Sequence, residues 1–251
     1  GHINLLTLVL RGTAACLWST TLYCSYSDTT PLAILHRGKT VHVRHLGRFI
    51  TFTLWCNCVL AVYWISSTVA ALISLQGQEV PLVLKRLTLL LWQIAGPLSW
   101  LVSIVVTFVL IPAAYANEPA KVDVMLGWRP PVLHNGYVLF CALELVISRP
   151  PMVSALFPLM ILFGLCYITF AWALYMRLGI YVYFFLDPSF TFAPVAYALL
   201  LAATTGFFSL NIWITSHLAS TSYPICSSTA VLLAALATCT WRKRKNSEKS
   251  S

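Results

Sequence analysis

Charged residues are scarce in this 251-residue sequence, since only 9% of the chain is Asp, Glu, Lys or Arg while 59% is apolar. An ordinary globular domain carries about a quarter charged residues. Seven acidic and sixteen basic side chains cannot give a fold of this length the polar surface that a soluble monomer needs. We therefore expect lipid to cover the protein, in agreement with a mean hydropathy of +0.81.

The sequence also lacks the patterns that hold metals. Eight cysteines lie almost entirely in apolar stretches, without a CxxC pair or interleaved histidines, so we expect them to be small core residues and not metal ligands. The net charge of +9 is spread between apolar blocks and the C-terminus and forms no single patch, which argues against nucleic acid as a partner. The lipid bilayer is the expected surrounding of the protein, and the sequence leaves the oligomeric state open.

Apolar runs of about twenty residues predict transmembrane helices. They cover residues 3–25, 49–75, 87–114, 130–148, 151–175, 191–215 and 224–240. Gly96-Pro97 predicts a kink in the third run, Arg11 interrupts the first, and the last is short. We expect an all-α fold, a polytopic transmembrane helical bundle of six to seven spans, with one domain at 1–241 and a basic, disordered tail at 242–251.

Basic residues predict the orientation of the bundle. Four lie in the loop at 36–48 and five in the C-terminal tail, and the positive-inside rule puts both segments in the cytoplasm. Seven spans leave six crossings between these segments and therefore place both on one side, so the rule favours seven. The prediction is a multi-pass protein of the endoplasmic reticulum or the plasma membrane.

Titratable groups inside membrane helices are costly, so they usually face the bundle interior and have partners. Glu144 lies near the middle of the fourth span, and we expect it to be protonated or to be paired with Arg11 or Gln93. His134 lies about a turn inside the same span, and Thr51 lies near the start of the second. The two spans run in one direction, so this pair shares a depth near one membrane face. A hydroxyl beside a neutral imidazole can act as nucleophile and general base, although a structural histidine is the alternative.

Spacing does not choose between Thr51 and Thr53, which point about 200° apart on one helix. A resemblance carried by three motifs distinguishes between the two threonines. Three motifs, in this order and spacing across about residues 45–190, are similar to the androgen-induced-gene family. They are RFITF at 48–52, Gly127-Trp128 with His134 six residues after the tryptophan, and GIYVYFFL at 179–186.

That family comprises small membrane proteins of six spans and includes threonine hydrolases of fatty acid esters of hydroxy fatty acids. The resemblance implies that Thr51 is the nucleophile and His134 the catalytic histidine. It also implies hydrolysis of a branched lipid ester through an acyl-threonine intermediate, with no cofactor and no metal.

A substrate of this kind keeps one free carboxylate, which needs a binding group at the membrane interface. Arg48 and Arg177 flank helix ends on the same face, where a guanidinium can bind a carboxylate bidentately. Tyr181 belongs to the aromatic segment at that level, and Asn135 is a candidate oxyanion donor. Each residue also has an ordinary interpretation, because basic and aromatic side chains commonly anchor helix ends at the interface.

Two other classes of function remain open at this point. One is a carrier in which Glu144, Arg11 and Asn211 line a polar path through the bundle. The other is a receptor or scaffold, for which the number of spans is the only support. Solute flux that depends on Glu144 and not on Thr51 would favour the carrier.

Overall fold

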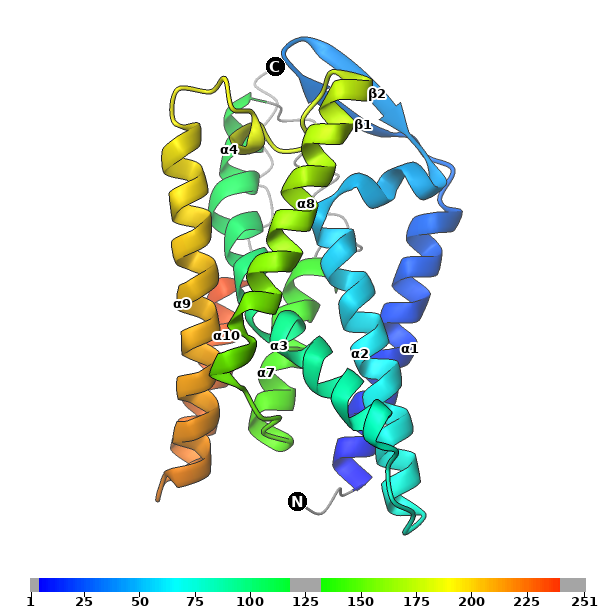
Figure 1. The fold of residues 1–251 in the computed structure, drawn as a ribbon, viewed down its shortest axis with the longest axis vertical. Coiled ribbons are helices and arrows are strands. Elements are labelled where there is room, and N and C mark those ends of the chain that lie inside the picture. The colour runs from blue at the N-terminus through cyan, green and yellow to red at the C-terminus, as the bar shows by residue number, and fades with distance from the viewer. Residues whose placement is uncertain (1–4, 118–131, 240–251) are drawn as a thin grey trace, which may run out of the picture.

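The computed structural model describes residues 5–117 and 132–239, which form a bundle of long helices capped at one end by a β-hairpin (Figure 1). The helices are α1 Leu5–Ser27, α2 Phe52–Leu75, α3 Leu82–Val105, α4 Ile111–Asn117, α7 Tyr137–Ile147, α8 Phe157–Leu178, α9 Ala193–Ser220 and α10 Pro224–Thr238. The strands are β1 Leu32–His36 and β2 Lys39–Val43. Short 3-10 turns are η1 His45–Ile50, η4 Ser154–Leu156 and η5 Phe184–Leu186, and π-helical turns are η2 Val106–Leu110 and η3 Val132–Gly136.

The expected all-α membrane bundle is confirmed. Five helical segments in the described residues are long and apolar enough to cross a bilayer, namely α1, α2, the run from α3 to α4, η4 with α8, and α9. The η3–α7 segment and α10 are shorter apolar helices. The protein is therefore a multi-pass membrane protein. The tail at 242–251, the start of the fourth run at 130 and the Gly127-Trp128 motif lie outside the described residues.

Large aromatic side chains fill the centre of the bundle. Trp18 of α1, Tyr63 and Trp64 of α2, Trp92 of α3 and Tyr137 of α7 are almost fully buried. Each buries a large apolar area and positions its helix against several neighbours. The long helix α3 changes direction part-way along its length as it crosses the bundle (Figure 1), as expected for a helix that contains a proline.

The hairpin of β1 and β2 replaces what the sequence indicated only as a basic loop. The strands pair antiparallel across a turn at Arg37 and Gly38, both of which have positive φ. Two of its basic residues bind the C-terminal end of α8 and the segment that follows α8. Lys39 Nζ donates to the Leu178 carbonyl at 2.5 Å, and Arg37 lies 2.8 Å from the Asp187 carboxylate. The hairpin therefore holds the α8–α9 segment against the end of the bundle.

Candidate functional site

Glu144 is fully buried in the last turn of α7, and its partner is Arg11, the first of the two expected candidates. Arg11 Nε donates to Glu144 Oε1 at 2.9 Å, and the Tyr63 hydroxyl donates to the same oxygen at 2.9 Å. Gln93 instead accepts a hydrogen bond from the backbone amide of Val153. The carboxylate that a carrier would use thus joins α1, α2 and α7, which indicates a structural role.

The same contact defines how α2 and α7 lie beside each other. Tyr63 and Glu144 are 81 residues apart in the sequence. About two helical turns nearer the hairpin, Cys56 and Tyr137 also lie close together, and they too are 81 residues apart. Two contacts with one offset mean that the helices run parallel in register. Continued from α7 into the π-helical turn η3, the same offset puts His134 near the level of the start of α2.

Thr51 precedes the first residue of α2 and acts as its N-cap, with an extended backbone. Its hydroxyl makes a long contact of 3.4 Å to the Arg48 carbonyl, and its own carbonyl accepts from the amides of Leu54 and Trp55. His134 is half-buried in η3, and its Nδ1 atom is buried without a hydrogen-bond partner among the described residues. No hydrogen bond joins Thr51 to His134 in this part of the chain.

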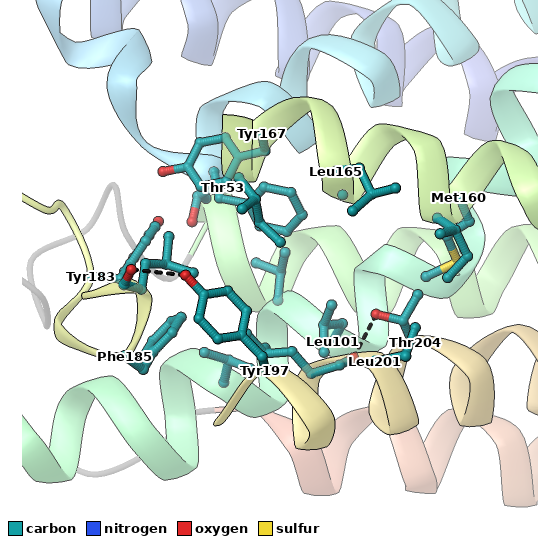
Figure 2. A pocket seen from close by; sticks show the side chains of 18 of the residues that line it. Thr53, Leu101, Met160, Leu165, Tyr167, Tyr183, Phe185, Tyr197, Leu201 and Thr204 are labelled. Atoms are coloured by element: carbon teal, nitrogen blue, oxygen red, sulfur yellow. Dashed lines mark hydrogen bonds between the residues drawn. The ribbon is translucent and has the colours of Figure 1, made fainter. Parts of the chain in front are cut away.

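A cavity of about 300 Å³ lies beside the start of α2, bounded by α3 and η2, α8, the segment between α8 and α9, and α9 (Figure 2). Thr53 lines this cavity, whereas the lining residues do not include Thr51 or His134. The orientation of α2 is held by Asn57, whose side chain donates to the Thr53 carbonyl and accepts from the indole of Trp18, both at 2.7 Å.

Hydroxyl groups gather at the hairpin end of the cavity. The Tyr183 hydroxyl lies beside the Thr53 hydroxyl and the first backbone amides of α2. Tyr167 and Tyr197 also line this end, but their hydroxyls donate at 2.9 Å to the carbonyls of Ile50 and Leu186. Burial raises the pKa of Tyr183 to about 12, so its hydroxyl is a neutral donor at physiological pH. The opposite end, around Met160, is apolar apart from the hydroxyl of Thr204, which donates to the Leu200 carbonyl (Figure 2).

Neither arginine proposed as a carboxylate ligand lines the cavity. Arg48 lies 3.1 Å from the Asp28 carboxylate and donates to the Thr30 carbonyl, so it fastens the chain before the hairpin to the start of α2. Arg177 is exposed in the last turn of α8. Of the two, Arg177 is the one whose guanidinium is open to the interface.

The other two proposed contacts also lie outside the cavity lining. Tyr181 is buried and stacks on Tyr175, with ring centroids 4.5 Å apart. Asn135 is buried in η3, and its backbone carbonyl lies 3.9 Å from Cys239 Sγ. Tyr181 and Asn135 therefore pack against neighbouring segments and do not line the cavity.

Sequence reasoning missed the cavity, although it had named two of its residues. The sequence presents Thr53 as the alternative to Thr51, and it presents Tyr183 only as part of the aromatic segment GIYVYFFL. The spacing of the tyrosines in GIYVYFFL does not predict their placement, because residues two apart in an extended segment point to the same side. In the structure the Tyr181 ring meets His36 of the hairpin, whereas Tyr183 lines the cavity.

No protein-family model, curated protein or solved structure matches this chain. The function must therefore be inferred from the geometry of the cavity and its neighbourhood and from the three sequence motifs. That geometry combines an apolar cavity, a cluster of neutral hydroxyl donors and the N-terminus of a long helix.

Proposed function

We propose that the protein is an integral membrane hydrolase that cleaves fatty acid esters of hydroxy fatty acids, or related lipid esters, with Thr51 as nucleophile and His134 as general base. One observation carries this proposal. The polar end of an apolar cavity lies at Phe52 and Thr53, the residues that directly follow Thr51, at the depth that the α2–α7 register gives to His134. An ester bond at that end has its alkyl chain among apolar side chains.

The chemistry needs a nucleophilic hydroxyl and a group that takes its proton. In the first step Thr51 Oγ1 attacks the ester carbonyl while His134 accepts the hydroxyl proton, which then passes to the leaving alkoxide. The hydroxy fatty acid departs and an acyl-threonine remains. Water, deprotonated by His134, hydrolyses that ester and regenerates the threonine. Before the attack, the Thr51 hydroxyl must leave its 3.4 Å contact to Arg48 by rotation about χ1.

The tetrahedral intermediate needs donors for its oxyanion. The first amides of a helix have no intrahelical partner and carry positive partial charge. In α2 these are the amides of Phe52 and Thr53, which lie beside the Tyr183 hydroxyl. We assign the oxyanion to these amides and to the Tyr183 hydroxyl, because such preorganised donors are a large source of catalysis.

The free carboxylate of the substrate belongs at the membrane interface. We assign it to Arg177, which is exposed at the hairpin end of the bundle, since the guanidinium of Arg48 already binds Asp28. Because basic segments favour the cytoplasmic side, we place the hairpin and the C-terminal tail in the cytoplasm, with the protein in the endoplasmic reticulum or plasma membrane. The proposed reaction uses no metal or cofactor.

The experiment is hydrolysis of a palmitoyl ester of hydroxystearic acid by the purified protein in detergent or nanodiscs. We expect turnover by the wild-type chain and its loss in Thr51→Ala and in His134→Ala. Thr68→Ala, which removes another α2 hydroxyl that bonds only its own helix, and His42→Ala on the exposed face of β2 are matched controls. Turnover retained by either active-site variant would remove that residue from the mechanism, and an inactive wild-type protein would refute the hydrolase.

A further inference from the structure

The lining of the cavity restricts the charge of the ligand that it can bind. Among the described residues its lining includes no charged side chain. Its polar atoms are neutral hydroxyls, which gather at the hairpin end except for that of Thr204, and the Thr204 hydroxyl donates to the Leu200 carbonyl of its own helix. A carboxylate or a phosphate inside it would lose its hydration without gaining a counter-ion. The occupant therefore has an uncharged polar end and an apolar remainder, as an acyl chain with its ester carbonyl has.

The dimensions of the cavity limit the length of chain that it encloses. Along α8 the lining extends from Ile168 to Met160, and along α9 from Tyr197 to Thr204. At a rise of about 1.5 Å per residue these stretches are about 10–12 Å long. If a methylene fills about the 30 Å³ of a water molecule, the 300 Å³ hold about ten chain atoms.

The cavity opens sideways toward the surrounding lipid. Two of its lining residues, Leu165 of α8 and Leu201 of α9, are 54% and 55% exposed on the outside of the bundle. A chain that is longer than the enclosed space can therefore leave between these two side chains without entering water.

We propose that the cavity binds one acyl chain of a lipid ester from its carbonyl end. The carbonyl lies at Thr53 and Tyr183, about ten carbons fill the space between α8 and α9, and the rest of a longer chain passes between Leu165 and Leu201 into the bilayer. The identity of the ligand as an ester rests on the proposed function, whereas the capacity for one uncharged chain rests on the cavity alone.

Chain length gives the first quantitative test. Each methylene buried contributes about 0.8 kcal/mol, so affinity should rise about fourfold per carbon up to about ten carbons and then stay level. Competition by methyl esters of increasing length against a photoreactive probe measures this, with methyl palmitate carrying a mid-chain diazirine and a terminal alkyne as the probe. An increase that continues unchanged beyond ten carbons, or no dependence on length, would overturn the proposal.

Two glycines give a matched pair of variants that locate the binding site. Gly164 lines the cavity and a side chain added there meets open space, while Gly206 of α9 is exposed and also has nothing near it. Gly164→Leu should reduce saturable labelling at least tenfold, because its side chain occupies the site of the acyl chain. Gly206→Leu should label like the wild-type protein. Equal labelling of the two variants would contradict the proposal.

A second pair keeps the test decisive if Gly164→Leu does not fold. Thr204 and Thr205 each bond the carbonyl four residues earlier in α9, but only Thr204 lines the cavity. Thr204→Leu should therefore weaken labelling, and Thr205→Leu should not.

Labelling also separates this inference from the proposed hydrolase. If Thr51→Ala protein is labelled in the α8 and α9 peptides while wild-type protein hydrolyses no ester, the cavity assignment stands and the hydrolase fails. If the wild-type protein hydrolyses esters but the label lies in other peptides, the cavity assignment fails.

Discussion

The Tyr63 hydroxyl donates a 2.9 Å hydrogen bond to Glu144 Oε1, the oxygen that also receives Arg11 Nε. Three helices thus meet at one carboxylate oxygen inside the membrane. Because the Tyr63–Glu144 contact has the same offset as the Cys56–Tyr137 contact, it helps to set the register that levels His134 with the start of α2.

Removal of Glu144 should strongly destabilise the fold. Breaking a buried ion pair on one side leaves an uncompensated charge, which costs about 3–5 kcal/mol, so Glu144→Ala should lower the midpoint of thermal unfolding in detergent. Glu79→Ala is the control, because the Glu79–Lys85 pair is exposed and such pairs contribute little. The double variant Arg11→Leu/Glu144→Leu should recover much of the loss. A double variant no more stable than Glu144→Ala would contradict this account.

The identity of the nucleophile predicts how conservative variants behave. Thr51→Ser keeps a hydroxyl at the same atom and should retain part of the activity. A fluorophosphonate should label wild-type and Thr51→Ser protein but not Thr51→Ala. Thr53→Ala, which keeps Thr51, should still be labelled. Labelling lost in Thr53→Ala and retained in Thr51→Ala would transfer the nucleophile to Thr53, the threonine that lines the cavity.

Tyr183→Phe tests the proposed oxyanion donor. Removing one such donor typically lowers kcat by about 10²–10³, while the affinity for the chain should change little because the ring remains. Tyr175→Phe is the control, since Tyr175 stacks on Tyr181 outside the cavity lining. A rise in KM at unchanged kcat would mean that Tyr183 only binds the substrate.

The attachment of the hairpin should depend on pH through Asp187. Burial alone would raise the pKa of this carboxyl, but hydrogen bonds from Ser189 and the nearby His36 and Arg37 together lower it below 3.8. A lowered pKa in the folded state means that the contact stabilises the hairpin at neutral pH and that this contribution is lost as the pH falls through the folded-state pKa.

Hydrogen exchange of the β1 and β2 amides measures this attachment. Asp187→Asn should lower the protection factors of these amides at neutral pH, and it should reduce the further loss of protection that the wild-type protein shows at acidic pH. Glu79→Gln, at the other end of the bundle, is the control. Unchanged exchange in Asp187→Asn would show that the strands are held by other contacts, such as the bond from Lys39 to Leu178.

The helices could be predicted from the sequence because a bilayer imposes a length and an apolar composition on every span. The seven apolar runs all coincide with helices in the described residues. The pairing of Glu144 with Arg11 was predictable for a related reason, since a buried charge needs a partner and few candidates exist. The hairpin was not predicted, because the positive-inside rule already accounts for basic residues between two membrane spans. Its strand pattern is nevertheless present, since Val41 and Val43 alternate with polar residues.

The cavity could not be predicted from the sequence. Its walls come from segments that are far apart in the chain, and its width depends on how α8 and α9 pack. The rotation of α2 decides whether Thr51 or Thr53 faces the cavity, and that rotation depends on the tertiary contact between Asn57 and Trp18. Periodicity shows that the two threonines point apart, but it does not show which neighbour each one meets.

The segment at 183–186 that closes the cavity at its polar end is followed directly by Asp187, to which the hairpin is attached. A displacement of the hairpin would therefore also move the segment that closes the cavity. The shape of this space inside the bundle is in this way coupled to ion pairs that lie at its polar end.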